Sequence, residues 1–477
     1  MNENELLLRA KEERDEIFDR YDKGRDSSNY INSWEDTKFE VYHRADRYGF
    51  IQNDRNANDI NNSVNNNQYE RTIELSLIRE KKWLSMLSRW NKTSTQEKLK
   101  RRIYKGIPNK LRPEAWKRLL NIKDMISKNE GVYQQMLKLA RTFSTETRQI
   151  DFDVNRQFRE HVYYCERYST KQKSLFNVLI AYSMYNMELG YCQGMAGVAG
   201  ILLMYMDEEE AFWALSIFMC DPKYAMHGLF IVGFPKLQRF LSHHDKILAK
   251  FLPKLHKHFT KHSLDAILYS IKWFFVIFVE RIPFSLCLRI WDIYMIEGER
   301  VVTAMAYTIL HLHRKKLMNM KDMDEMTQFL QIHLHKDFGY EDDFVIKVLN
   351  KSMEHLRKYK MDLPPPPQEC ELPKYEFGRI IEPEFDTKVG RRKTKFTEVE
   401  RKTTETVILR QEENAQSDMV SNYSYDNNAE LAGSIKTYRS FNSLATSLAT
   451  SLAVSSRSMN GNDDGDDSDS STEVTHL

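Results

Sequence analysis

Turn-forming residues are scarce in this chain, and this scarcity limits the folds open to it more than any other feature. Glycine occurs 17 times and proline 12 times in 477 residues, and four of the prolines stand in one run at 364–367. All-β sandwiches and barrels need glycine and proline at many tight turns. No stretch alternates apolar and polar residues over the length of a strand. The sequence therefore predicts an all-α protein.

Charge and cysteine content exclude several classes of protein. Lys and Arg number 70 and Asp and Glu 68, so the net charge of +2 is far from the basic balance of a nucleic-acid-binding protein. The five cysteines form no Cys-x-x-Cys pair and favour a reducing compartment. The N-terminus is charged, unlike a signal peptide, and the apolar stretch 266–279 is too short for a transmembrane segment and contains Lys272. We expect a cytoplasmic protein in which 266–279 is a buried helix.

Helical periodicity dominates the chain up to about residue 360. Two polar segments interrupt or end it: an Asn-rich loop at 53–68, and the region from 363 onward, which is rich in Pro, Ser and Asp and is predicted to be disordered. Predicted helices cover 5–22, 69–92, 114–120, 175–185, 196–206, 207–220, 235–258, 264–280, 284–296, 301–316 and 341–359.

These patterns predict four parts in the chain. Residues 1–99 form a helical N-terminal extension that includes the Asn-rich loop, and 100–300 form a large helical domain. Helices in 301–362 pack on that domain, and 363–477 form the disordered tail. One large helical unit fits the scarcity of turns better than several compact domains would.

The usual sequence patterns of nucleotide, metal and hydrolytic sites are absent. There is no phosphate-binding G-x-x-x-x-G-K-[ST] loop, no G-x-G-x-x-G and no G-x-S-x-G. Gly194, Gly197 and Gly200 are three residues apart, a spacing that on a helix lets a neighbouring helix approach closely and does not bind a phosphate. His258 and His262 have no acidic residue between them, so a solvated helix face is favoured over a zinc site. We expect no cofactor and no metal bound by the chain itself.

Two short segments stand out as candidate functional residues. In 150–156, Asp153 and Arg156 lie three residues apart, so on a helix the carboxylate can orient the guanidinium. In 191–195, Gln193 lies at a junction between two predicted helices, with glycines on either side. Spacing alone leaves open a surface ion pair for Arg156 and a helix cap for Gln193.

Taken in order along the chain, four motifs resemble those of the TBC-domain family, the helical activators of Rab GTPases. Together they cover about 200 residues, which makes the combination specific. The matching residues are Lys105-Gly106-Ile107-Pro108 with Leu111, Arg112 and Trp116; Ile150, Asp153 and Arg156; Tyr191, Gln193 and Gly194; and Arg289-Ile290-Trp291-Asp292 with Glu297-Gly298.

Flanking segments resemble the RN-tre subgroup of this family, so the resemblance covers roughly residues 5–365. One departure is Pro113, where close relatives tend to have glycine; proline fits the first turn of a helix, and no loss of function is expected. The segments similar to the subgroup are Trp34-Glu35-Asp36, Asp46-Arg47-Tyr48-Gly49-Phe50, the helix with Trp83 and Trp90, Met226-His227-Gly228 and Phe234-Pro235-Lys236-Leu237.

The resemblance implies a GTPase-activating protein rather than an enzyme with its own turnover. An arginine supplied in trans accelerates GTP hydrolysis by about 10³–10⁵ because it neutralises charge on the transferred phosphoryl group. By its match, Arg156 would be that arginine finger, and Gln193 would be a second finger that positions the attacking water. GTP and Mg²⁺ would be bound by the partner GTPase.

Other matched residues are expected to support these two fingers or the fold. Asp153, Tyr191 and Gly194 would hold the fingers or contact the GTPase. A buried Trp packs helices and a buried Asp–Arg pair fixes them, so the remaining motif residues would be structural. These structural residues are Arg112, Trp116, Trp291 and Asp292.

The expected partner is a Rab GTPase of vesicle trafficking and endocytosis, with the protein in the cytoplasm at endosomal or Golgi vesicles. The run from Pro364 to Pro367 offers an SH3-type ligand, and Thr475-His476-Leu477 a PDZ-type C-terminus. The alternative function is a catalytically silent TBC scaffold that binds GTPases and SH3 or PDZ partners; the presence of both fingers favours activity. A hydrolase with its own pocket lacks a recognisable nucleophile–base pair.

Overall fold

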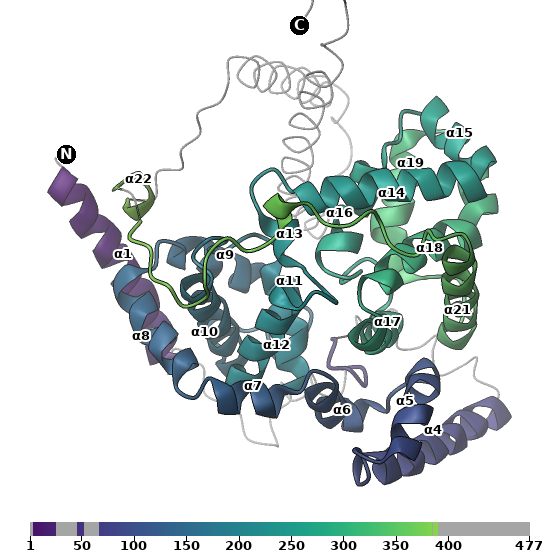
Figure 1. Ribbon diagram of the computed structural model, residues 1–477, viewed down its shortest axis with the longest axis horizontal. Coiled ribbons are helices and arrows are strands. Elements are labelled where there is room, and N and C mark those ends of the chain that lie inside the picture. The colour runs from purple at the N-terminus through teal and green to yellow at the C-terminus, as the bar shows by residue number, and fades with distance from the viewer. Residues whose placement is uncertain (1–2, 25–44, 52–65, 384, 390–477) are drawn as a thin grey trace, which may run out of the picture. The chain divides into compact units, whose positions relative to one another are not determined.

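Helices make up the architecture of the described part of the chain, which in this computed structural model comprises residues 3–24, 45–51, 66–383 and 385–389 (Figure 1). Within these ranges there is no strand, only isolated antiparallel bridges between Ala45 and Ile51 and between Phe50 and His161. The predicted all-α class is confirmed.

The first half of the described chain runs from the N-terminal helix α1 to the packed helices α10, α11 and α12. Between α1 and α4, residues 25–44 and 52–65 lie outside the described residues, and the second range holds most of the predicted Asn-rich loop, whose last residues begin α4. The elements are α1 (Glu3–Lys23), α4 (Asn66–Leu87), α5 (Thr93–Tyr104), η2 (Asn109–Leu111), α6 (Arg112–Leu119), α7 (Ile122–Lys128), α8 (Val132–Phe143), α9 (Thr147–Arg156), α10 (Thr170–Tyr185), α11 (Met195–Tyr205) and α12 (Glu208–Cys220).

The second half contains four helices of 14 or more residues, α14, α17, α18 and α21, joined by shorter elements. The elements are α13 (His227–Phe230), α14 (Pro235–Phe251), α15 (Pro253–Lys261), α16 (Ala266–Phe275), α17 (Phe284–Glu297), α18 (Glu299–Asn319), α19 (Met323–Gln328), the π-helical turn η3 (Phe329–His333), α20 (Leu334–Lys336), α21 (Asp342–Lys358), η4 (Glu369–Glu371) and α22 (Phe385–Lys388).

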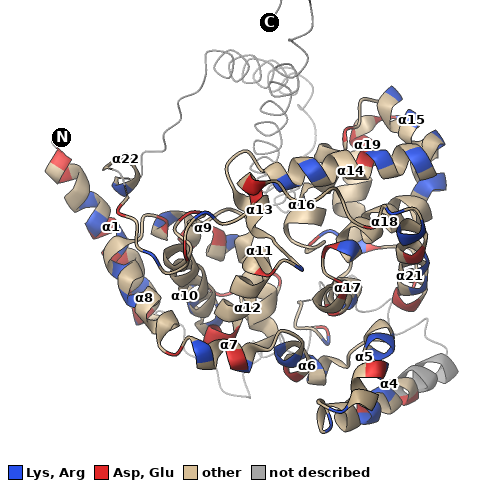
Figure 2. Ribbon diagram, viewed as in Figure 1, with Lys and Arg blue, Asp and Glu red and all other residues tan. Residues whose placement is uncertain are grey.

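The core of the first half is the packing of α10 against α8, α9, α11 and α12. Helix α11 carries no charged residue, so it is tan throughout in Figure 2. It is buried over nearly its whole length. A helix that is apolar on all sides must be covered on all sides. Helix α12 begins with a capping box in which Asp207 and Glu210 satisfy free backbone N–H groups.

Two predicted helices are shorter in the structure than the periodicity suggested. The predicted helix 235–258 is two helices, because Pro253 has no N–H to continue α14 and begins α15 instead. The predicted helix 264–280 ends at Phe275; beyond it Ile277 and Phe278 adopt positive φ angles of 50° and 64°. The freed carbonyl of Ile277 accepts a hydrogen bond of 3.1 Å from the indole of Trp291, so a tertiary contact compensates the interrupted helix.

The prediction of a disordered tail from residue 363 is wrong for its first part. Residues 364–383, here called the strap, cross from the beginning of α14 past α13 to the end of α10, as the green segment between α21 and α22 in Figure 1 shows. The reason is a set of buried and hydrogen-bonded contacts: Glu371 is 4% exposed, and the Gly378 N–H donates to the Tyr185 carbonyl. Residues 390–477 lie outside the described residues.

Candidate functional site

The last turn of α9 presents the first candidate residue. Arg156 is the final residue of this helix, and its Nη2 lies 2.7 Å from Oδ1 of Asp153, one turn earlier. The Asp153 side chain is buried, whereas that of Arg156 is 32% exposed. The predicted i,i+3 ion pair is therefore present, with an anchored carboxylate and a guanidinium that reaches the surface.

A tyrosine joins the second candidate segment to the first. The Tyr191 hydroxyl donates a hydrogen bond of 2.6 Å to Oδ2 of Asp153, and Gln149 Nε2 lies 3.3 Å from Oδ1. Burial, and then the Asp153 carboxylate, raise the pKa of Tyr191 well above its usual value, so the hydroxyl keeps its proton. The two motifs that the sequence singled out thus meet at one carboxylate.

Gln193 lies two residues beyond this junction, in the turn that leads into α11. Gly194 has a φ of 113° and a β-carbon there would be strained, so glycine allows the sharp entry into α11. The Nε2 atom of Gln193 is buried and has no hydrogen-bond partner among the described residues. An unsatisfied buried donor costs about 1–3 kcal/mol, a cost that a binding partner can remove.

A second charged pair flanks α9, and sequence reasoning did not identify it as part of the site. Lys272 Nζ lies 3.3 Å from Glu280 Oε2, and Gln157 Nε2, next to Arg156, lies 3.4 Å from Glu280 Oε1. Burial, and then Arg281, lower the pKa of Lys272 to about 8. Burial would raise the pKa of Glu280, but Lys272 and Arg281 lower it below its usual value. The signal in the sequence was the lone charge in an apolar stretch, which needs a partner when buried.

The four predicted structural residues form a buried group that fixes α6 to α17. Asp292 receives two hydrogen bonds from Arg112, of 3.0 and 3.2 Å, and one of 2.8 Å from the indole of Trp116. The rings of Trp116 and Trp291 are stacked with centroids 5.9 Å apart. This group fixes the positions of α6 and α17 relative to each other.

The tail predictions fall partly outside the described residues. Pro364 is buried, and the carbonyl of Pro365 accepts a hydrogen bond of 2.7 Å from Arg239 Nη1, so the proline run is held on α14. Thr475, His476 and Leu477, the predicted PDZ-type ligand, lie outside the described residues. No helix in the described ranges is both long enough and apolar enough to cross a bilayer.

Solved structures identify the fold. The Chlamydomonas flagellar RabGAP TBC domain superposes with a TM-score of 0.53 at 21% sequence identity, covering 64% of this chain and 98% of that chain. The Ypt/Rab-GAP domain of Gyp1p superposes with a TM-score of 0.51 at 19% identity, covering 60% and 99%. The described helices therefore have the all-α TBC fold.

Sequence comparison gives the region of the chain that matches a known family. Residues 109–318 match the family model of the Rab-GTPase-TBC domain. TBC1 domain family member 10B of Mus musculus is 32% identical over 316 residues, and that of Homo sapiens 32% over 313 residues. Each alignment covers 64% of this chain, but the chain spans only 38% and 37% of these relatives.

Proposed function

We propose that this protein accelerates GTP hydrolysis by a Rab-family GTPase and that Arg156 and Gln193 are the groups it supplies. The observation that carries the proposal is the Asp153 carboxylate, which holds Arg156 on one oxygen and Tyr191, two residues before Gln193, on the other. An arginine and an amide on two segments that are joined at one carboxylate suit a partner's phosphoryl group and its attacking water.

In this mechanism the chain supplies a positively charged side chain and positions the attacking water, and the GTPase holds the reacting groups. The GTPase binds GTP and Mg²⁺, so the chain has no cofactor of its own and is an activator rather than an enzyme with its own turnover. Arg156 offers a planar fork to two oxygens of the transferred phosphoryl group. The Gln193 Nε2 atom, buried and without a partner in the described residues of the free protein, gains a partner at the attacking water once the side chain turns outward.

The resemblance to the RN-tre subgroup extends the proposal to trafficking. It supports a Rab of endosomes or the Golgi as the substrate, with a role in endocytosis, and a cytoplasmic protein recruited to those vesicles. The matched TBC domain and the relatives named TBC1 domain family member 10B support the choice of a Rab as the partner.

Single-turnover GTP hydrolysis with a panel of purified Rabs tests the proposal. We expect Arg156→Ala to reduce the stimulated rate at least about a thousandfold and Gln193→Ala about a hundredfold. Tyr191→Phe, which removes the bond to Asp153, should reduce it less. Arg159→Ala is the matched control, because Arg159 is an exposed arginine three residues beyond Arg156.

The outcomes separate an activator from a scaffold. Unchanged stimulation by both Arg156→Ala and Gln193→Ala would contradict the assignment of the two fingers. A wild-type protein that binds GTP-loaded Rabs in a pull-down without accelerating hydrolysis would instead be the silent scaffold.

A further inference from the structure

The loop between α10 and α11 carries Gln193, and its first residues are held from outside the matched TBC domain. This loop, residues 186–194, is tied at its end by the bond from Tyr191 to Asp153. At its beginning, the strap contacts the residues that leave α10. The Gly378 N–H donates a hydrogen bond of 2.7 Å to the Tyr185 carbonyl, and the Lys374 N–H one of 2.8 Å to Glu188 Oε2.

Ring packing adds to these hydrogen bonds. The ring of Phe377 stacks on that of Tyr185, with centroids 5.5 Å apart and planes 19° from parallel. The Ile381 N–H points to the sulfur of Met187 at 3.2 Å. Three of the four residues from 185 to 188 thus have a contact from the strap, within eight residues of Gln193.

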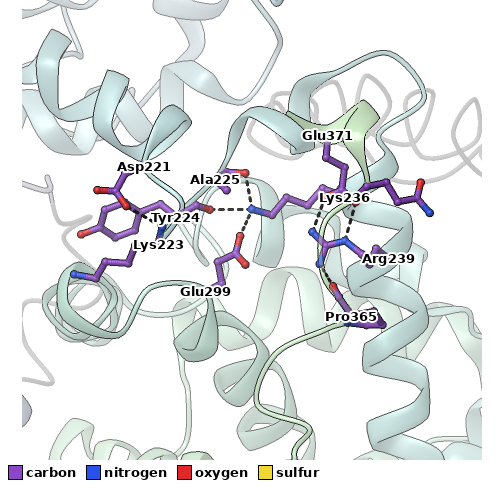
Figure 3. Close-up of polar contacts among 10 residues, drawn as sticks. Asp221, Lys223, Tyr224, Ala225, Lys236, Arg239, Glu299, Pro365 and Glu371 are labelled. Carbon is purple, nitrogen blue, oxygen red and sulfur yellow. Dashed lines mark hydrogen bonds and ion pairs between the residues drawn. The ribbon is translucent and has the colours of Figure 1, made fainter. Parts of the chain in front are cut away.

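The strap is itself anchored at its other end by a buried ion pair. Figure 3 shows the guanidinium of Arg239, on α14, with both Nε and Nη2 toward the Glu371 carboxylate, at 2.8 and 2.5 Å, and Nη1 toward the Pro365 carbonyl. The Glu371 side chain is 2% exposed. A β-carbon on Gly228 would lie 2.9 Å from that of Glu371, so glycine in α13 makes room for the strap. A bidentate, buried pair of this kind resists release.

The loop has room to move if the strap is released. A cavity of about 200 Å³ lies between the end of the strap and the loop, with Met187, Gly190, Ile381 and Pro383 in its lining. Gly190 has a φ of 59° and precedes Gln193 by three residues. Contacts from the strap therefore restrict the loop on the side of the cavity, while Asn186 is held on the inner side by Tyr182 and His227.

We propose that the strap positions Gln193, because by holding residues 185–188 it fixes the loop that presents the Gln193 amide. The part of the chain needed for GTPase activation then extends beyond residues 109–318, which match the family model. This inference rests on the proposed function for Gln193. Phe377, Gly378 and Lys374 are positioning residues in this proposal, because they act on Gln193 through residues 185–188.

The test uses full-length protein with Phe377→Ala, which removes the stacking on Tyr185. A displacement of about 1 Å costs up to about a hundredfold in rate, and we expect kcat for stimulated hydrolysis to fall about tenfold while KM for the GTPase stays within about twofold. Tyr375→Ala is the matched control, because Tyr375 is a half-exposed aromatic residue in the same segment. Arg239→Gln, which releases the strap at its far end, should act in the same direction.

A double-substitution cycle makes the test specific for Gln193. In a Gln193→Ala background, where Arg156 still gives residual stimulation, Phe377→Ala should cause no further loss of kcat. An equal fractional loss in both backgrounds would overturn the proposal, because the strap would then act through general stability. Thermal unfolding of each variant shows whether the fold is kept.

Hydrogen exchange separates this proposal from the proposed function. Amides of 186–193 should exchange faster in Phe377→Ala than in the wild type or in Tyr375→Ala. Unchanged exchange refutes the positioning role even if the protein activates a Rab. If no Rab is stimulated by the wild type, the proposed function fails, and faster exchange still establishes that the strap holds the loop.

Discussion

At the scale of single residues, shared partners decide the arrangement of the candidate site. Asp153 serves two elements at once: Arg156 on its own helix and Tyr191 on the loop after α10. The sequence predicted the ion pair from its spacing, because i,i+3 residues are neighbours on a helix. It could not predict the bond from Tyr191, since 38 residues separate it from Asp153 and only the packing of α9 against α10 brings them together.

The Lys272–Glu280 pair gives a prediction about pH. The pKa of Lys272 is about 8 in the folded protein and about 10.4 when unfolded, so the unfolded chain binds more protons in this interval. Lys272 therefore makes stability rise as pH increases from about 8 to about 10.4. In Lys272→Met this rise should be smaller by about 1–2 kcal/mol between pH 7 and 9.5, measured by urea unfolding at both values.

A matched lysine checks the origin of this effect. Lys254→Met removes an exposed lysine from α15 and should leave the pH dependence as in the wild type. An identical dependence in Lys272→Met and the wild type would show that Lys272 does not titrate in this range.

At the scale of elements, glycines control how closely α11 approaches its neighbours. The sequence predicted close packing from the spacing of three, and the structure identifies the neighbour as the irregular segment after α9 rather than another helix. A β-carbon on Gly200 would lie 2.6 Å from the ring of Phe158, whereas one on Gly197 would meet Val276 at an ordinary 3.5 Å. Periodicity gives the face of a helix but not what covers it.

These distances predict opposite effects for two similar substitutions. Gly200→Ala forces the buried ring of Phe158 to shift, an overpacking that costs about 1–3 kcal/mol of unfolding free energy. Gly197→Ala finds space and gains helix propensity, so its stability should be unchanged or up to about 1 kcal/mol higher. Urea unfolding of both variants measures the difference, and equal stabilities would contradict the packing described for Gly200.

At the scale of the whole described chain, segments from both sides of the matched region, residues 109–318, pack on that region. The strap reaches α10 from the C-terminal side, and α1 packs on α8 and α9 from the N-terminal side. The helices of the whole chain could be predicted because each one shows its own apolar periodicity within a short stretch of sequence. The docking of the strap was not, because a proline run followed by polar residues is typical of disorder, and only contacts with Arg239 and Tyr185 order it.

The packing of the N-terminal helix α1 on the matched region gives a prediction about stability. The ring of Tyr21 is 1% exposed and stacks on Phe176 of α10, with centroids 4.1 Å apart. Replacing a buried aromatic residue by alanine costs about 3–5 kcal/mol, so Tyr21→Ala should lower the unfolding free energy by that amount. Leu8→Ala, at a residue that is 57% exposed, is the control. A loss in Tyr21→Ala no larger than in the control would mean that α1 does not contribute to stability.

The bond between Gly378 and Tyr185 also has a consequence for synthesis of the protein. About 190 residues separate its two ends, and a ribosome adds roughly 5–20 residues per second. The helices around α10 therefore emerge about 10–40 s before the strap that closes over them. By the end of that interval a nascent chain has most of its core but an uncovered loop, so the order of translation places completion of the Gln193 loop after formation of the helices that support it.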